Sequence, residues 1–141
     1  MKYLGIFSII CWLSGCATTP VPYTDATSVP QDNILEGYKQ FSNQAENRSR
    51  VIVVRDSGML GAALPAKLSI NGTEVAKLWS SERLELFLEP GTYIFGVEPS
   101  PRLGGALVET TFEIRSGKSY AFRISLTLSG AFSFQQSTQL E

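Results

Sequence analysis

Residues 84–97, LELFLEPGTYIFGV, are the clearest indication of the fold class of this chain. The leucines of its first half stand at every second position, and Tyr93 and Phe95 resume the same period after Pro90-Gly91. A period of two places apolar side chains on one face of a β-strand, and a Pro-Gly pair favours a tight turn. The stretch therefore predicts two neighbouring strands joined by a hairpin.

The same organisation extends over the rest of the C-terminal part. Residues 50–55 (RVIVVR) form a continuous run rich in β-branched side chains, which is typical of a strand buried on both faces. Asn71-Gly72 separates two alternating segments and is a strong signal for a two-residue hairpin. Alternation also runs through Trp79 and Leu128. Seven or eight short strands with regular turns predict an all-β fold, an antiparallel Ig-like or transthyretin-like β-sandwich over residues 49–141.

A spacer and a helix are expected ahead of the sandwich. Residues 17–30 are rich in Thr and Pro, and such a composition favours an extended, poorly ordered tether. Asp32 or Asn33 is suited to cap a helix. Apolar side chains follow at helical spacing, namely Ile34, Leu35, Tyr38 and Phe41. Although Gly37 disfavours a helix, the spacing predicts a short one within residues 31–48.

The N-terminus carries the features of an export signal. Lys2 precedes an apolar run over residues 3–13, which is shorter than the roughly 20 residues of a membrane-spanning helix and suits a secretory signal. The run ends in Leu13-Ser14-Gly15-Cys16, which resembles the lipobox of bacterial lipoproteins. The resemblance implies that residues 1–15 are removed as a signal peptide and that Cys16 carries lipid, such as palmitate. The alternative, a buried N-terminal element, offers no reason for the small-small-cysteine ending.

Lipid at Cys16 predicts where the protein resides. One acyl chain holds a protein at a bilayer only marginally, whereas two or more hold it stably. In bacterial lipoproteins an Asp after the cysteine favours retention in the inner membrane, so the resemblance implies the outer membrane for Ala17. We therefore expect Cys16 and a flexible tether, residues 16–30, to hold the domain at the bacterial outer membrane, facing the periplasm.

Composition argues against several classes of function. The net charge is −1 and no basic patch is visible in the sequence, which disfavours nucleic-acid binding. Histidine is absent, so the commonest metal ligand and the usual general base are both missing. Cys11 and Cys16 are the only cysteines, and the resemblance places one in the signal and the other under lipid. We expect no enzyme activity, no cofactor, no metal and no nucleic-acid partner.

The paired carboxylates of the chain do not change this expectation. Glu85 with Glu89, and Glu109 with Glu113, share a strand face at i,i+4, which is about 13 Å in an extended strand. The acid and base of a glycosidase lie only about 5 to 9.5 Å apart. We interpret these glutamates as solvent-facing. Asp56 has no acidic neighbour in the sequence, whereas a calcium loop needs several oxygen ligands.

Five segments carry a resemblance to a known family, namely VIVVR (51–55), LSING (68–72), VAKL (75–78), LFLEPGTY (86–93) and SGKSYAF (116–122). They resemble a family of uncharacterised small bacterial lipoproteins, a domain of unknown function with N/D-G, L-x-P-G and G-K-x-Y turns in this order. The L-x-P-G hairpin also resembles that of PEGA and carboxypeptidase-regulatory sandwiches. The resemblance covers residues 50–128, implies the sandwich fold and supplies no catalytic residue.

Two loops interrupt the regular strand spacing, at residues 57–65 and 99–106. Both carry apolar side chains beside glycines, and binding residues are often carried on loops of a rigid scaffold. The loops predict a partner-binding surface. Its predicted contacts are Met59, Leu60, Leu103 and, for an anion or carboxylate, Arg102. The alternative is a pair of mobile connectors whose leucines fold back on the core.

Three phenylalanines leave two interpretations open. Phe87 occupies a position where its strand otherwise shows glutamates, and Phe132 and Phe134 lie in the last segment. These rings either cover the core or form an exposed apolar patch that meets a partner.

These observations predict a non-enzymatic lipoprotein of the cell envelope with a structural or protein-binding role. The first alternative is an accessory lipoprotein of a secretion or transport assembly. The second is a carrier of a small apolar ligand between the sheets, although a sandwich of this size has little room for one.

Overall fold

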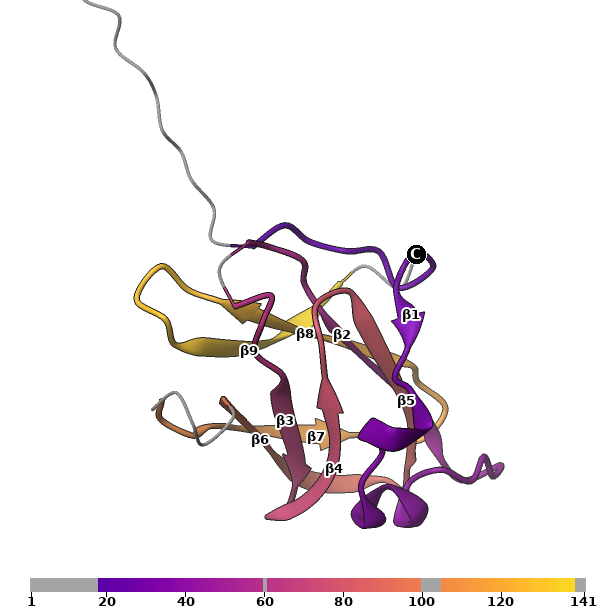
Figure 1. Ribbon diagram of the computed structural model, residues 1–141. Helices are drawn as coiled ribbons and strands as arrows, with labels where there is room; N and C mark the ends of the chain where they lie inside the picture. The colour runs from indigo at the N-terminus through magenta and orange to yellow at the C-terminus, as the bar shows by residue number, and fades with distance from the viewer. Residues whose placement is uncertain (1–17, 60, 100–104, 139–141) are drawn as a thin grey trace, which may run out of the picture.

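The computed structural model describes residues 18–59, 61–99 and 105–138 (Figure 1). Two short 3-10 turns, η1 (Gln31–Asn33) and η2 (Glu36–Gln40), stand among the strands. The strands are β1 (Thr27–Ser28), β2 (Ser49–Arg55), β3 (Ala66–Ile70), β4 (Thr73–Leu78), β5 (Glu82–Leu88), β6 (Gly91–Pro99), β7 (Val108–Ile114), β8 (Tyr120–Leu126) and β9 (Phe132–Ser137).

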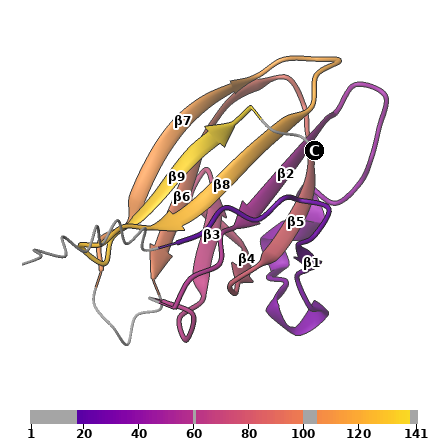
Figure 2. The same ribbon diagram turned by 90° about the horizontal axis from the view of Figure 1, so that it is seen from above.

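The strands form two sheets that pack face to face. The five-stranded sheet has the order β1-β5-β2-β8-β9, and the four-stranded sheet has the order β4-β3-β6-β7. In both ribbon views β8 and β9 lie over β6 and β7 (Figure 1, Figure 2). The predicted all-β sandwich is therefore confirmed. Its pairing is mostly antiparallel, but β2 pairs with β8 in parallel and β1 with β5 in parallel.

Strand β2 is the centre of the five-stranded sheet. Its residues Val51 and Val53 face the core with 0 % exposure, and Ile52 and Val54, on the other face, are only 2 % and 4 % exposed. The continuous β-branched run is buried on both faces, as its sequence predicts. The outer face of β2 must therefore be covered by another part of the chain.

The core lies between the sheets and is built by the alternation that the sequence shows. Leu84, Leu86 and Leu88 all point inward from β5. The turn between β3 and β4 is formed by Asn71 and Gly72, both with positive φ (50° and 77°), which is the backbone of a tight two-residue hairpin. The predicted hairpin at this position is confirmed.

The structure separates the three phenylalanines. Phe132 and Phe134 are 3 % and 4 % exposed and belong to the core. The ring of Phe134 stacks on those of Phe95 and Phe122, with centroids 5.3 and 5.1 Å apart. Phe87 is half-buried on the other face of β5, where its backbone N–H donates to the Phe41 carbonyl at 2.7 Å. Core packing is thus the correct interpretation for Phe132 and Phe134.

The helix predicted within residues 31–48 is wrong, because the segment forms only η1 and η2. The backbone here bonds to the edge of β4: the Leu35 N–H donates to the Val75 carbonyl at 2.9 Å, and Ile34 forms a bridge with Ala76. A Cβ at Gly37 would lie 2.4 Å from the Glu74 carbonyl oxygen, so the chain approaches β4 too closely for a side chain. Within the described part of the chain, no helix has the length and apolar character needed to cross a membrane.

Residues 18–30, which we call the strap, cross the outer face of the five-stranded sheet and then join its edge, where β1 pairs with β5. Val21 and Ala26 are 9 % and 5 % exposed and pack against Ile52 and Val54 of β2. The Thr- and Pro-rich composition predicted a poorly ordered tether here, and this prediction is wrong for residues 18–30, which pack against the sheet. The physical reason is the apolar outer face of β2, which the strap removes from water.

Candidate functional site

The strap is held to the sandwich by a buried carboxylate. Asp56, which follows β2 directly, is 4 % exposed. Its oxygens accept hydrogen bonds from the Arg123 guanidinium at 2.5 Å, from the Ser125 hydroxyl at 2.6 Å and from the Val21 backbone N–H at 3.3 Å. Arg123 also donates to the Val21 carbonyl at 3.2 Å. Charge-assisted hydrogen bonds of this kind are the strong ones, so Asp56 and Arg123 clamp the strap at Val21.

A second set of contacts holds the middle of the strap. Arg83 donates to the Tyr23 carbonyl at 2.6 Å. The guanidinium carbons of Arg50 and Arg83 both lie 5.9 Å from the centre of the Tyr23 ring, within the range of cation–π attraction. Arg50 is oriented by Glu85, to which it donates two hydrogen bonds at 2.7 and 3.1 Å. These bonds to Arg50 hold the pKa of Glu85 below its usual value.

The beginning of the strap is fixed beside the connection between β2 and β3. The Thr19 N–H donates to the Ser57 carbonyl at 2.6 Å, and the Ser57 N–H donates back to the Thr19 carbonyl at 3.0 Å. Thr19 stands three positions after Cys16 in the sequence. Cys16 itself lies outside the described residues.

The buried side chain of Arg55 holds the connection between β2 and β3 through hydrogen bonds. The side chain is 3 % exposed, and its guanidinium donates to the carbonyls of Leu64, Gly61 and Leu78, the last two at 2.7 Å. Burial lowers the pKa of Arg55 to about 10, so the group remains a cation at neutral pH. Its hydrogen bonds with Leu64, Gly61 and Leu78 are all donated to backbone carbonyls. We therefore assign Arg55 a structural role: it fixes the backbone of the β2–β3 connection and the end of β4.

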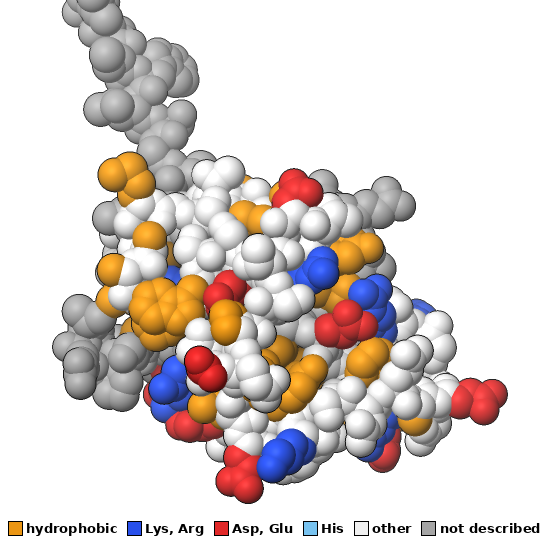
Figure 3. Space-filling view, turned by 45° about the vertical axis from the view of Figure 1, so that its right-hand side comes forward, with side chains coloured by type: hydrophobic (Ala, Val, Ile, Leu, Met, Phe, Trp, Pro, Cys, Tyr) orange, Lys and Arg blue, Asp and Glu red, His pale blue; other side chains and the backbone are white. Residues whose placement is uncertain are grey.

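Apolar side chains are concentrated at this end of the sandwich. We call it the loop end and define it by the described residues of four connections, namely 57–59 with 61–65, 79–81, 105–107 and 127–131. Five large hydrophobic side chains are exposed in the described residues, and four stand here: Met59 (97 % exposed), Trp79 (37 %), Leu107 (48 %) and Leu128 (74 %). Figure 3 shows hydrophobic side chains gathered along the left margin of that view. The fifth, Ile94, lies on the outer face of β6.

The connections at the loop end are neighbours in space. The Ser81 N–H donates to the Arg55 carbonyl at 3.1 Å, which joins the turn after β4 to the end of β2. A Cβ at Gly61 would lie 2.5 Å from a methyl of Leu126, so the β2–β3 connection lies against the end of β8. At the ladder ends Ala66 pairs with Pro99, and Val97 pairs with Val108.

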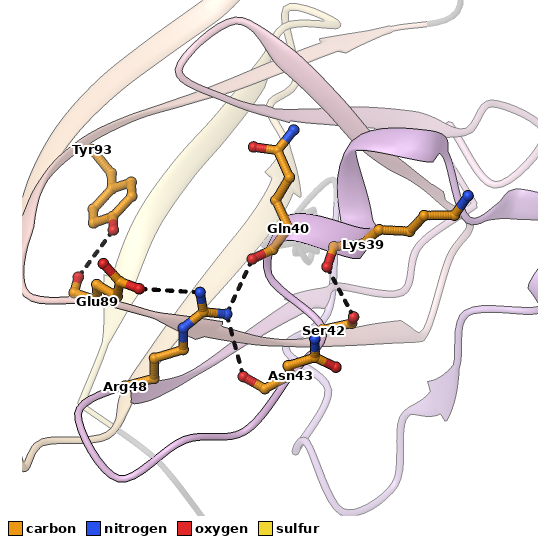
Figure 4. A network of polar contacts seen from close by, with 7 residues as sticks. All are labelled: Lys39, Gln40, Ser42, Asn43, Arg48, Glu89 and Tyr93. Atoms are coloured by element: carbon orange, nitrogen blue, oxygen red, sulfur yellow. Dashed lines mark hydrogen bonds and ion pairs between the residues drawn. The ribbon is translucent and has the colours of Figure 1, made fainter.

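The opposite end of the sandwich is polar and charged. Figure 2 separates the two ends, with the β8–β9 connection at the left and the β7–β8 connection at the upper right. At the opposite end Arg48 donates to the carbonyls of Gln40 and Asn43, at 3.1 and 3.4 Å, and pairs with Glu89 at 3.1 Å (Figure 4). The Tyr93 hydroxyl donates to the Glu89 carbonyl at 3.0 Å. The polar groups at this end are therefore bonded to one another within the protein.

The structure places only one of the four predicted loop contacts. Met59 is fully exposed, as the partner-binding prediction requires. Leu60, Arg102 and Leu103 lie outside the described residues. The sequence did not identify Trp79, Leu107 and Leu128 as exposed loop residues. For Trp79 and Leu128 the reason is that the apolar–polar alternation continues through them and predicts that they belong to strands. The strands end earlier, at Leu78 and Leu126.

The predicted solvent-facing glutamates occupy outer positions. Glu89, Glu109 and Glu113 are exposed, and Glu85 is half-buried in its pair with Arg50. Arg123 and Ser125 engage both oxygens of Asp56. Among the residues that the structure describes, no three His, Cys, Asp or Glu side chains lie together as a metal site would need.

A small pocket opens beside the strap. It measures about 190 Å³ and is lined by Ser28, Val29, Gln31, Ile34, Tyr38, Arg83, Leu84 and Glu85. The Tyr38 hydroxyl donates to the Glu85 carbonyl at 3.1 Å, and burial raises the pKa of Tyr38. Pockets for drug-sized ligands measure about 300 to 1,000 Å³, so this one is small for such a molecule.

Comparison with known proteins adds no relative: no protein-family model matches the chain, and no curated protein is significantly similar to it.

Proposed function

We propose that this protein is a lipid-anchored, non-enzymatic lipoprotein of the bacterial envelope with a structural or protein-binding role. The observation that carries the proposal is the lipobox-like segment Leu13-Ser14-Gly15-Cys16, which ends two residues before the described domain begins at Thr18. Removal of residues 1–15 would leave a short lipidated N-terminus leading directly into the strap. Ala17 after the cysteine favours the outer membrane, with the domain facing the periplasm.

The buried charges of the described residues support a role without catalysis. Arg55, Asp56 and Glu82 are the buried charged side chains. Arg55 donates to backbone carbonyls, and Asp56 accepts from Arg123 and Ser125. Glu82 accepts from the Trp79 N–H at 2.7 Å. Each of these groups is committed to the fold, whereas a general acid or base must be available to a substrate.

The finer assignment of the fold is also part of this proposal. Sheets of four and five strands are the frame of Ig-like and transthyretin-like sandwiches, and their order here is compatible with that kind. The turn motifs at Asn71-Gly72, Pro90-Gly91 and Gly117-Lys118 support kinship with small lipoproteins of unknown function and with PEGA-like sandwiches. The carrier alternative is less well supported, because stacked rings such as Phe95, Phe122 and Phe134 occupy the space between the sheets.

Fatty-acid labelling in cells tests the anchor. We expect a clickable palmitate analogue to label the wild-type chain and a Cys11→Ser variant, since Cys11 leaves with the signal. A Cys16→Ser variant is expected to carry no label and to accumulate as an unprocessed or soluble form in fractionation. Label retained by the Cys16→Ser variant would overturn the anchor. Crosslinking of the anchored wild type then tests the binding role through the envelope proteins that it captures.

A further inference from the structure

The exposed hydrophobic side chains are distributed unevenly over the molecule. Four of the five large ones in the described residues stand at the loop end: Met59, Trp79, Leu107 and Leu128. They come from four different connections, so no single local sequence motif produces the cluster. Exposed apolar side chains gathered in one place mark an interaction surface.

The loop end also differs from the opposite end in charge. Its described residues, 57–59, 61–65, 79–81, 105–107 and 127–131, include no Asp, Glu, Lys or Arg, and Arg102, in the same connection as Leu107, lies outside the described residues. The connections at the opposite end carry Arg48, Glu89, Arg115 and Lys118. Small, hydroxyl-bearing and apolar residues enter a lipid interface without the cost of desolvating a charge. Trp is enriched at the boundary between lipid and water.

The strap brings the attachment point to this same end. Thr19 is fixed to Ser57 by two backbone hydrogen bonds, and only Ala17 and Thr18 separate it from Cys16. A chain extends by at most about 3.6 Å per residue, so Cys16 lies within about 11 Å of Thr19. A cysteine that carries lipid resides at the membrane surface. The loop end must then lie against that surface, and a protein partner has little room between the two.

We propose that the loop end rests on the lipid bilayer, with Met59 and Leu128 inserted among the lipids and Trp79 at the interface. This inference rests on the proposed lipid anchor at Cys16 and adds the orientation of the domain. The clamp of Asp56 and Arg123 on Val21 keeps the strap from lengthening the tether. The charged end around Arg48 and Glu89 points away from the membrane.

The chain contains a natural probe for this orientation. Trp12 and Trp79 are its only tryptophans, and Trp12 leaves with the signal, so the mature lipidated chain has Trp79 alone. We would reconstitute that chain in phosphatidylethanolamine and phosphatidylglycerol vesicles, with and without bromine on the acyl chains. Brominated lipids quench tryptophan only on close approach. The expected result is a loss of Trp79 fluorescence in the brominated vesicles.

Two variants supply the matched comparison. Trp79→Phe with Leu128→Trp keeps the probe at the loop end, and its fluorescence is expected to be quenched as well. Trp79→Phe with Ile94→Trp moves the probe to an exposed apolar position on the sheet face, where no quenching is expected. Urea unfolding midpoints show that each variant is folded. If a variant fails to fold, the wild-type Trp79 measurement decides by itself.

The outcomes distinguish this inference from the anchor on which it rests. A chain that carries lipid by mass spectrometry and floats with vesicles, yet shows no quenching at Trp79, overturns the orientation and leaves the loop end free for a protein partner. Equal quenching at positions 79, 128 and 94 overturns it too, because the domain then has no preferred face. A chain without lipid, still carrying Trp12, overturns the proposed anchor and this inference with it.

Discussion

The Asp56 carboxylate joins three parts of the chain that lie far apart in the sequence. It accepts hydrogen bonds from Val21 of the strap and from Arg123 and Ser125 of β8. The Arg123 side chain is 18 % exposed and that of Asp56 is 3 % exposed, so water screens the pair only weakly. A single substitution at this position therefore acts on both the sheet and the strap.

We expect Asp56→Ala to lower the free energy of unfolding by roughly 3 kcal/mol, because it leaves the Arg123 cation buried without its partner. Urea unfolding of the purified protein measures this. The double variant Asp56→Ala/Arg123→Met is expected to recover part of the loss, since no unpaired charge remains. Glu113→Ala breaks an ion pair with the exposed Arg115 and serves as the control, with an unchanged midpoint. A double variant no more stable than Asp56→Ala would contradict the argument.

Glu85 makes the stability of the protein depend on pH. Hydrogen bonds from Arg50 hold its pKa below the ordinary value of 4.5. A carboxylate with a lowered pKa stabilises the fold fully above its unfolded pKa, and this contribution disappears as the pH falls through the folded pKa. Between pH 7 and pH 3 we expect the urea midpoint of Glu85→Gln to fall less than that of the wild type. Glu109→Gln, on the exposed face of β7, should fall like the wild type. Equal falls for Glu85→Gln and the wild type would refute this account.

Among the elements of the fold, the strap is the one most sensitive to the loss of a single apolar contact. Val21 and Ala26 cover Ile52 and Val54 of β2, and the Thr27 and Val29 N–H groups donate to the carbonyls of Ser81 and Arg83, both at 3.0 Å. The strap therefore covers the outer face of β2 and also extends the edge of the sheet through β1. Its amide protons report directly whether the strap is bound to the sheet.

We expect Val21→Ser to release the strap, because it removes the side chain that covers β2 beside the Asp56 clamp. In hydrogen exchange monitored by mass spectrometry, the amides of Ala26, Thr27 and Val29 should lose protection while those of β8 keep it. Thr24→Ala, at an exposed strap position, should exchange like the wild type. Unchanged protection in Val21→Ser would show that the polar contacts alone hold the strap.

The elements also show what a local sequence pattern can predict. Alternation is read within one strand, so the core-facing leucines of β5 and the Asn71-Gly72 turn were predictable. The spacing of Ile34, Tyr38 and Phe41 is compatible both with a helix and with an irregular chain that packs along the edge of β4. The choice depends on the hydrogen bond from Leu35 to Val75, a contact between distant residues that the local sequence does not contain.

The sequence does not predict which segments of the chain come to lie against one another in the folded protein. The run at residues 51–54 indicates a strand buried on both faces, but nothing in it identifies the strap as the cover. The Thr and Pro content of the strap is typical of disordered segments, and its order comes from the apolar face that it meets. The loop end was partly predictable through Met59, whereas Trp79, Leu107 and Leu128 come together only when the strands have been placed.

The parallel pairing of β2 with β8 has a consequence for when this chain folds. Val51 pairs with Tyr120, so most of the sandwich sequence lies between the two partners. Closing so long a loop is slow, and folding rates fall as contacts become less local. A nascent chain emerging from its N-terminus cannot complete the central sheet until β8 has been synthesised. If the chain is exported as proposed, we therefore expect the domain to remain unfolded until translocation is nearly finished.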